Sequence, residues 1–308
     1  MKPRAVLIGG AGLVGQALVR TLARAGTFEP HVIDLRRPAA PGVRFDRADL
    51  LADELEGLLA GAEVVVHLAA QVNPPHPRRR ASMRRLHEEG TARVLRAAVR
   101  GGVKRFVLCS SAVVYGAHPD NPVPLVEDSP CRPNPDFPYA VDKARQEQLA
   151  RAHAREIEVV IARPAIIYAR QARSYLTEIL RRSPGVLPAI DGRRPPLQFV
   201  HVDDVAQALA RMAASRAGGV FNVCPQDWLA FDEVARLARL RPVYVPRRLV
   251  APALDVAARW APSWLRAPSY ILDYLSHPFV LSGARLEQAL GFRPQHASAE
   301  ALLDMLGR

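Results

Sequence analysis

The feature that most constrains the fold of this chain is a regular alternation of short apolar runs with segments of helical periodicity over its first half. The apolar runs are rich in Val, Ile and Leu, and their length is that of buried strands. Such alternation implies right-handed βαβ crossovers, and therefore an α/β fold with a doubly wound parallel sheet. The predicted strands are RAVLIG (4–9), HVIDL (31–35), EVVVHLAA (63–70), KRFVLCSS (104–111) and IEVVIARP (157–164), with helices at 13–25, near 51–60, near 81–100 and at 139–154.

The character of the sequence changes after Pro164. Proline-rich connections such as SPGVLPAIDGRRPP and APSWLRAPSY separate short helical segments there. Connections of this kind predict a smaller C-terminal lobe that caps the sheet and binds substrate. We therefore expect a first domain at 1–165, joined by parts of 198–224, and a second lobe made mainly of 166–308.

A glycine-rich stretch, GGAGLVG, follows the first predicted strand and begins the first predicted helix. Its Gly9 permits a tight turn, Gly12 lets the backbone approach a pyrophosphate, and Gly15 lets the helix pack closely on the strand. The free N–H groups of Leu13 and Val14 face the anion. The stretch predicts a dinucleotide site of the Rossmann type in the first domain.

The identity of the dinucleotide depends on Asp34, which ends the second strand 19 residues after Gly15. A carboxylate at this position accepts hydrogen bonds from a ribose diol and repels a 2′-phosphate. NAD is therefore the expected cofactor. NADP stays open as the less favoured alternative, because Arg36 and Arg37 could clamp a 2′-phosphate.

Lys143 is one of only three lysines in the chain, and it lies four residues after Tyr139 in PYAVDKARQE. That spacing places both side chains on one face of a helix. For proton transfer near neutral pH, the tyrosine pKa must fall by about three units, or about 4 kcal/mol. An ammonium about 4 Å away supplies about that much at an effective dielectric of about 20. We predict that Tyr139 is an acid/base whose pKa is lowered by Lys143.

Two serines, Ser110 and Ser111, follow a buried strand in KRFVLCSS. Ligands of open α/β sheets bind at the carboxyl ends of the strands, where a serine hydroxyl can hold a substrate oxygen. Order and spacing together make the Ser, Tyr and Lys a candidate catalytic set.

In this combination the chain resembles, over nearly its whole length, the extended short-chain dehydrogenase/reductases, also called the NAD-dependent epimerase/dehydratase family. The matching stretches are GGAGLVG, DRADL (46–50), HLAA (67–70), SSAVVYG (110–116), YAVDK (139–143), RPAIIY (163–168), FVHVDDVAQA (199–208), GVFNV (219–223) and LGFRP (290–294).

The resemblance implies roles for particular residues. Ser111 orients the substrate oxygen, Tyr139 is the acid/base, and Lys143 binds ribose and lowers the tyrosine pKa, while hydride passes between the substrate carbon and the nicotinamide. It also implies a homodimer formed through the helices near 84–100 and 139–154. The implied cofactor-binding residues are Gly9, Gly12, Leu13, Val14, Gly15, Asp34, Asp49, Leu50, Leu68, Ala69, Ala70, Tyr139, Lys143 and Pro164, with Asp49 and Leu50 at the adenine.

Three positions depart from the family pattern. His87 stands where the family usually has an Asn, three residues before a Gly-Thr pair, so the helix geometry or a proton path differs there. Ile166 and Leu197 align with an Asn and an Arg that hold the diphosphate in nucleotide-sugar epimerases. RPAIIY and the apolar helices near 247–275 are more similar to the hydroxysteroid-dehydrogenase and flavonoid-reductase branch. These departures favour a small, mostly apolar hydroxy or keto substrate over a UDP-sugar.

Three functions are compatible with the sequence. The favoured one is an NAD-dependent oxidoreductase that interconverts a secondary alcohol and a ketone. The first alternative is a nucleotide-sugar epimerase or dehydratase with tightly bound NAD, which uses the same tyrosine. The second alternative, from another class, is a dinucleotide-binding regulator without turnover, which the intact Ser, Tyr and Lys disfavour.

Composition bears on partners and compartment. The net charge is +12, but the arginines are scattered along the chain without a basic and aromatic array, so no nucleic-acid partner is predicted. Their densest cluster, at 77–90, is interpreted as a solvated helix face, with a contact to an anionic ligand as the alternative. The chain contains neither an export signal nor 18 consecutive apolar residues, and its three cysteines form no ligand-like group. We expect a cytoplasmic protein without a membrane span.

A metal site is not predicted. His201, Asp203 and Asp204 lie close together in FVHVDDVAQA, but a helix follows and requires an N-cap. An Asp is a good N-cap, so we assign these carboxylates to capping.

Overall fold

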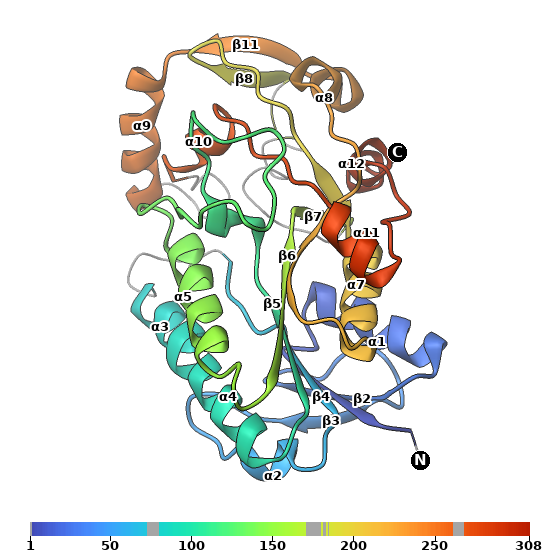
Figure 1. Cartoon of the computed structure of the whole chain (residues 1–308). Helices are drawn as coiled ribbons and strands as arrows, with labels where there is room; N and C mark the ends of the chain where they lie inside the picture. Colours follow the sequence, from blue (N-terminus) through green and yellow to red (C-terminus); the bar gives the residue numbers. More distant parts are fainter. Residues whose placement is uncertain (1, 73–79, 171–179, 181–182, 184, 261–267) are drawn as a thin grey trace.

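The seven-stranded sheet at the centre of the molecule is wholly parallel, with the strand order β10-β6-β5-β4-β1-β2-β3. The computed structural model describes residues 2–72, 80–170, 180, 183, 185–260 and 268–308 (Figure 1). The sheet strands are β1 (Arg4–Ile8), β2 (Glu29–Asp34), β3 (Arg44–Arg47), β4 (Val64–His67), β5 (Arg105–Cys109), β6 (Glu158–Pro164) and β10 (Gly219–Val223). The predicted α/β fold with a doubly wound parallel sheet is thus confirmed.

Alternation of side chains along the strands explains why both faces of this sheet are covered. In β1, Ala5 and Leu7 pack into one hydrophobic core, and Val6 and Ile8 pack into a second core on the opposite face. Successive side chains of a strand point to opposite faces, so a strand that is apolar at every position requires helices on both sides. The described helices are α1 (Leu13–Ala25), α2 (Glu56–Leu59), α3 (Arg80–Arg85), α4 (Thr91–Arg100), α5 (Pro138–Ala152), α7 (Val202–Ala214), α8 (Phe231–Ala238), α9 (Arg247–Trp260), α10 (Ile271–Tyr274), α11 (Ala284–Leu290) and α12 (Ser298–Leu306).

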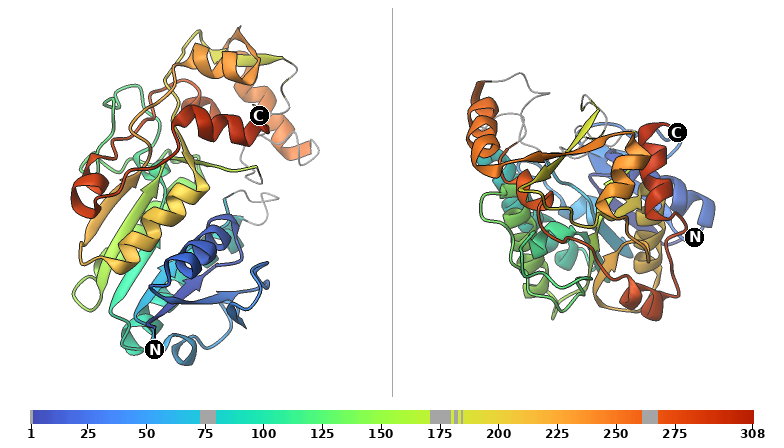
Figure 2. Two further views of the ribbon diagram at one scale, coloured as in Figure 1. Left: turned by 90° about the vertical axis from the view of Figure 1, so that its right-hand side faces the viewer. Right: turned by 90° about the horizontal axis from the view of Figure 1, so that it is seen from above.

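The helices divide between the two faces. Helices α1 and α7 pack against each other and contribute to the first core, while α2, α4 and α5 contribute to the second. Figures 1 and 2 show the two layers on either side of the sheet. Helix α1 ends at Gly26, which has a φ of 65° and donates its N–H to the carbonyl of Leu22, so a left-handed C-cap stops the helix there.

The rest of the chain forms a smaller region at one end of the sheet (Figure 2). It contains two parallel two-stranded sheets, β7 (Ile166–Tyr168) with β9 (Phe199–His201), and β8 (Val186–Ile190) with β11 (Arg241–Val245). A third core, which includes Leu187, Phe199 and Leu302, is formed by residues of these strands and of helices in the same region.

Two predicted helices differ from the structure. The segment near 51–60 is helical only at Glu56–Leu59, and the one near 81–100 is interrupted by a π-helical turn, η2 (Leu86–Gly90). The strand β3 (Arg44–Arg47) was not predicted, because its charged residues are mostly exposed at the edge of the sheet and lack an apolar pattern.

The N-cap of α7 is His201, so the expectation of an aspartate cap is wrong. The Nδ1 atom of His201 accepts a hydrogen bond from the N–H of Asp203 at 3.2 Å. The carboxylate of Asp204 is buried instead and accepts hydrogen bonds from the N–H groups of Gln295 and His296 at 2.8 and 3.1 Å. Within the described ranges, no group of three or more His, Cys, Asp or Glu side chains is arranged to hold a metal ion.

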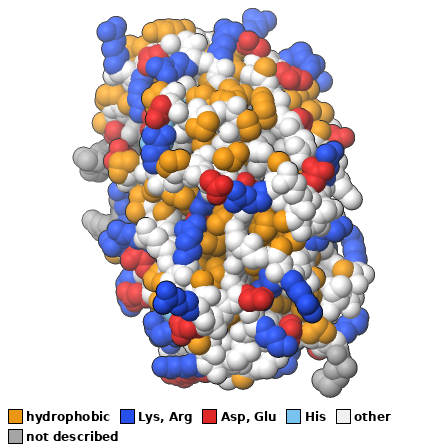
Figure 3. Space-filling model, in the orientation of Figure 1, with side chains coloured by type: hydrophobic (Ala, Val, Ile, Leu, Met, Phe, Trp, Pro, Cys, Tyr) orange, Lys and Arg blue, Asp and Glu red, His pale blue; other side chains and the backbone are white. Residues whose placement is uncertain are grey.

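Charged side chains are mixed on the surface. On the face seen in Figure 3, Lys and Arg are spread among acidic and hydrophobic side chains. Within the 77–90 cluster, residues 77–79 lie outside the described part, and Arg84 and Arg85 pair with Glu88 and Glu89 one turn later, as on a solvated helix face. Among the helices that the structure describes, none has both the length and the apolar character needed to cross a bilayer.

Candidate active site

Two cavities meet at the glycine-rich turn, at the carboxyl ends of the central strands. The larger has a volume of about 330 Å³ and the smaller about 200 Å³. Both are lined by Gly9, Gly12, Leu68 and Ala70, so together they form one groove across the sheet. This is the edge at which open α/β sheets bind ligands.

Three of the four glycines of the turn, Gly9, Gly12 and Gly15, differ in what an added Cβ atom would meet. A Cβ atom on Gly9, whose φ is +80°, would lie 2.6 Å from the backbone of Ala69, and one on Gly15 would lie 2.5 Å from the backbone of Gly10. A Cβ on Gly12 would meet only the carbonyl of Gly9, at 3.3 Å. Gly12 is also the N-cap of α1 and has no side chain over the free N–H groups of the first turn. The turn therefore fits a pyrophosphate at Gly12.

The smaller cavity has the features of an adenosine site. The Asp34 carboxylate lines it and accepts hydrogen bonds from the N–H groups of Ala11 at 3.0 Å and Arg36 at 3.1 Å. A carboxylate has about four lone-pair positions, so two are left for a ribose diol. Asp49 and Leu50 line the same cavity, as do Leu68, Ala69 and Ala70. The residues present therefore fit the adenosine half of NAD.

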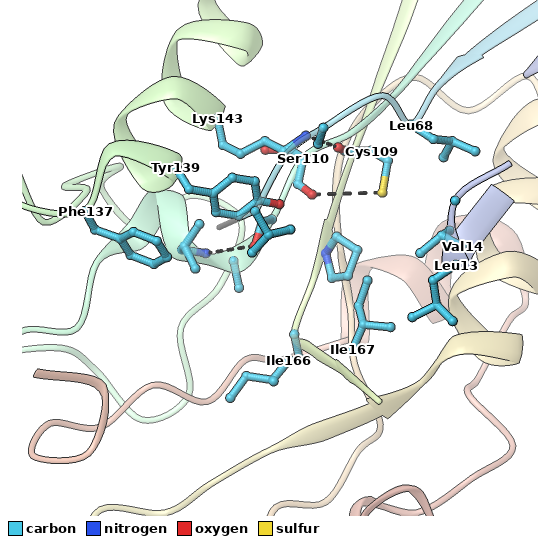
Figure 4. A pocket seen from close by; sticks show the side chains of 18 of the residues that line it. Leu13, Val14, Leu68, Cys109, Ser110, Phe137, Tyr139, Lys143, Ile166 and Ile167 are labelled. Carbon is cyan, nitrogen blue, oxygen red and sulfur yellow. Dashed lines mark hydrogen bonds between the residues drawn. The ribbon is translucent and has the colours of Figure 1, made fainter. Parts of the chain in front are cut away.

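Helix α5 carries the predicted acid/base pair. Pro138 occupies its first position, and Tyr139 and Lys143 both line the larger cavity. The Lys143 side chain is only 1% exposed, and its ammonium donates a hydrogen bond to the carbonyl of Cys109 at 2.8 Å. Burial lowers the pKa of Lys143 to about 8. Figure 4 shows both side chains directed from α5 toward the end of β5.

The pKa of Tyr139 does not follow the expectation from spacing. Burial raises it above the ordinary value, and a hydrogen bond with Ser111 opposes this only in part. The Lys143 nitrogen is 5.7 Å from the centre of the tyrosine ring and is turned toward Cys109. In the protein alone, desolvation outweighs the effect of Ser111, so the pKa of Tyr139 lies above its ordinary value and the side chain is a neutral phenol at physiological pH.

The structure gives the two serines different surroundings. The hydroxyl of Ser110 donates to the buried carboxylate of Glu147 at 2.6 Å. The hydroxyl of Ser111 hydrogen-bonds with Tyr139 and accepts from the N–H of Val113 at 3.4 Å. Of the two serines, Ser111 is therefore the one whose hydroxyl is next to Tyr139, and its role toward a substrate oxygen stays a prediction.

A buried ion pair beneath the site was missed by the sequence analysis. Arg163, 1% exposed, donates to both carboxylate oxygens of Glu147 at 2.9 and 2.7 Å, and to the hydroxyl of Tyr115 at 2.8 Å. Glu147 lies one turn after Lys143 on α5, so the pair connects the catalytic helix to β6. A charged residue inside the apolar run IEVVIARP was the available signal, because a buried arginine requires a partner.

The far part of the larger cavity is apolar. Ile166 lies in its wall, whereas Leu197 is buried in the third core and does not line this cavity. Among the described residues that line this cavity, Lys143 is the only cation. The apolar lining also includes Val72, Val113, Phe137, Pro164, Ala165, Ile167, Ile271, Tyr274 and Phe279. Figure 4 shows Ile166 and Ile167 across the cavity from Tyr139, with Leu13 and Val14 on a third side.

Several known proteins are similar to this chain in sequence or in structure. The model of the NAD dependent epimerase/dehydratase family matches residues 5–224. The chain is 31% identical to a 3-diazoavenalumate denitrifying reductase of Streptomyces sp, over 99% of each chain. It is 29% identical to a dTDP-glucose 4,6-dehydratase of Streptomyces griseus, over 98% of this chain and 92% of that one. The structure of MoeE5 in complex with UDP-glucose and NAD is similar, with a TM-score of 0.77 and 26% identity over 99% and 97% of the two chains.

Proposed function

Since this chain belongs to the NAD dependent epimerase/dehydratase family, we propose that it is an oxidoreductase that interconverts a secondary alcohol and a ketone on a small, mostly apolar metabolite. The prediction of NAD as cofactor is confirmed at the level of the family. The substrate class rests on one observation, the apolar lining of the larger cavity around Tyr139. A nucleoside diphosphate needs cationic or amide partners, and the described lining offers only Lys143.

In the proposed reaction, different residues of the chain bind the cofactor, orient the substrate and transfer the proton. Gly12 and the first turn of α1 hold the pyrophosphate, and Asp34 holds the ribose of the adenosine half. Bound NAD supplies the hydride acceptor or donor. Ser111 orients the substrate oxygen by a hydrogen bond, and Tyr139 gives a proton to that oxygen in ketone reduction or takes one in alcohol oxidation. Tyr139 is in the protonated form that reduction requires, as a tyrosine with an ordinary pKa would be, and burial raises its pKa further.

Lys143 has a positioning and electrostatic role in this proposal. Its ammonium is held by the Cys109 carbonyl close to Tyr139 and would donate a further hydrogen bond to a ribose hydroxyl of bound NAD. The apolar walls formed by Ile166, Ile167 and Phe279 exclude water from the reacting atoms.

The nucleotide-sugar epimerase or dehydratase is the second candidate, because relatives with such names cover nearly the whole chain. It uses the same Tyr139 in a transient oxidation. The two candidates differ in whether they release the cofactor. An oxidoreductase exchanges its cofactor at each turnover, whereas an epimerase or dehydratase keeps NAD through purification.

The test is a screen for NADH absorbance with apolar secondary alcohols and ketones, run beside UDP-glucose and dTDP-glucose conversion. We expect turnover with the first group. Tyr139→Phe should lower kcat by about 10²–10⁴-fold while NAD still binds. Tyr244→Phe, at an exposed position on β11, is the matched control and should leave kcat unchanged. Conversion of a nucleotide sugar by protein that already contains NAD would reject the oxidoreductase in favour of the second candidate.

A cytoplasmic location and a homodimer stay predictions. The first rests on the use of cysteine and the second on the resemblance to the family. Sedimentation of the purified protein tests the second directly.

A further inference from the structure

His87, one of the departures from the family pattern, lies at a junction between the loop after β4, helix α5 and the ring of Tyr139. Its side chain is fully buried, yet both ring nitrogens have partners. Nε2 accepts a hydrogen bond from the N–H of Gln71 at 2.9 Å, and Nδ1 is 2.9 Å from the Asp142 carboxylate. The ring meets Tyr139 edge to face, with 6.1 Å between the ring centres and 67° between the planes.

These partners determine which nitrogen of His87 carries the proton. A backbone N–H can only donate, so Nε2 must offer its lone pair to Gln71, and Nδ1 must carry the hydrogen that Asp142 accepts. Burial lowers the pKa of His87, which keeps the ring neutral. A second proton on Nε2 would place two donors against each other at Gln71.

The two partners of His87 belong to the two walls of the active site. Gln71 follows Leu68, Ala69 and Ala70, which line the cofactor groove. Asp142 directly precedes Lys143 on α5. The imidazole is therefore a rigid link between the wall beside the cofactor and the helix that carries the acid/base pair.

The local backbone around His87 is unusual as well. His87 lies in the π-helical turn η2, which separates α3 from α4 and contacts α5. Single π-turns inside helices are rare and occur frequently at functional sites.

We propose that His87 is a positioning residue that fixes the distance between the cofactor wall, residues 68–72, and the catalytic helix α5 through its hydrogen bonds to Gln71 and Asp142. This inference rests on the proposed function in so far as Tyr139 and Lys143 are the reacting groups. A histidine that only filled space in the core would contribute to stability without affecting how the folded protein holds its cofactor.

The test compares two substitutions by NAD⁺ affinity, measured by calorimetry at a temperature where circular dichroism shows each protein to be folded. His87→Phe keeps the ring but removes both hydrogen bonds, and it should weaken NAD⁺ binding about tenfold. His87→Gln offers one acceptor and one donor on a flexible side chain, and it should restore the affinity to within about threefold of wild type.

The control is His31→Phe. His31 is also fully buried and is paired with a carboxylate, Asp46, at 2.7 Å, but on β2 and outside both cavities. It should reduce thermal stability and leave NAD⁺ affinity within about twofold of wild type.

Two results overturn the proposal: an unchanged NAD⁺ affinity in His87→Phe, or a loss in His87→Gln as large as in His87→Phe. A measurement on wild type keeps the proposal testable even if His87→Phe does not fold. Proton–nitrogen correlation spectra of the histidine side chains should show His87 protonated at Nδ1 alone, and a proton on Nε2 would also refute it. None of these experiments needs a substrate, so failure to find a reactive alcohol would count against the proposed function and leave this inference standing.

Discussion

The ammonium of Lys143 is hydrogen-bonded to the carbonyl of Cys109 at 2.8 Å and is almost completely removed from solvent. The carbonyl is a dipole rather than a full charge, so it compensates the lost hydration only in part, and the pKa of Lys143 falls from 10.5 to about 8.

This pKa predicts a particular dependence of stability on pH. Between pH 8 and 10.5 the unfolded chain binds a proton at Lys143 that the folded chain does not, so the free energy of unfolding rises with pH in this window. Lys143→Met lacks this proton. The free energy of unfolding of wild type, measured relative to that of Lys143→Met, should therefore rise by about 3 kcal/mol between pH 7.5 and 10.5. Urea unfolding of both proteins without cofactor measures the difference, and a constant difference would contradict the buried ammonium. Lys104→Met serves as the control for loss of an exposed lysine.

Substitution of Gly12 and of Gly15 by alanine should affect different properties, NAD⁺ affinity in the first case and stability in the second. Gly15→Ala places a Cβ against the backbone of Gly10 and should cost about 3 kcal/mol of stability. Gly12→Ala places its Cβ 3.3 Å from the carbonyl oxygen of Gly9 on an extended backbone, so a small shift of that carbonyl should accommodate it and the melting temperature should fall less than in Gly15→Ala. The new methyl group would lie where we propose that the pyrophosphate binds. We expect its NAD⁺ affinity to fall at least about tenfold. Gly57→Ala, with no atom near its added methyl, is the control for both measurements.

Asp34 should determine the choice between NAD and NADP. Asp34→Asn keeps an acceptor for the N–H of Ala11 and removes the charge that repels a 2′-phosphate. The affinity for NADP⁺ should therefore rise about tenfold relative to the affinity for NAD⁺. Arg36, which lines the same cavity, is then available to the phosphate. Fluorescence titration with NADH and NADPH measures the ratio. Glu29→Gln removes a charge at the exposed start of the same strand and should leave the ratio of the two affinities unchanged. An unchanged ratio in Asp34→Asn would show that Asp34 takes no part in the selection.

The Arg163–Glu147 pair should be costly to break and tolerant of complete replacement. Arg163→Met leaves the buried Glu147 carboxylate without its main partner and should destabilise the protein by about 3–5 kcal/mol. Burial acts to raise the pKa of Glu147, but the hydrogen bond and charge of Arg163 bring it below 4.5. The stabilisation is therefore present above pH 4.5 and is lost as the pH falls through the lowered pKa.

Equilibrium unfolding of Arg163→Met and of the double variant Arg163→Met/Glu147→Leu separates the two effects. The double variant should recover much of the loss, since apolar pairs replace buried ion pairs well. A double variant as unstable as the single one would show that the contacts of Arg163 to Tyr115 and Glu127 dominate instead.

Much of the sheet was predictable because strands that are apolar at every position need cover on both faces. The first helix was predicted at 13–25 and lies at Leu13–Ala25, because Gly12 and Gly26 mark both of its ends. Features that depend on contacts between distant segments were not predictable. The charged edge strand β3 is defined by its pairing with β2. The hydrogen bonds of His87, in the π-turn, join it to Gln71 and Asp142, which are distant in sequence.

The same limit applies to the candidate site. Helical spacing predicted that Tyr139 and Lys143 share one face of a helix, and both side chains line the larger cavity. The spacing could not tell how far each side chain is removed from solvent. Desolvation depends on the whole surrounding structure, and it reversed the direction expected for the tyrosine pKa. The roles of Ser111, Tyr139 and Lys143 in catalysis stay predictions until the variants are assayed.

The return of the chain to the central sheet has a consequence for recombination. After β6 the polypeptide leaves the sheet to form β7, β8 and β9, comes back as β10 beside β6, and leaves again for β11. A chimera made by one crossover after β6 would therefore exchange part of the sheet along with the capping region. Grafting a new specificity from a relative requires two separate inserts, before and after β10, joined so that the edge strand of the recipient is preserved.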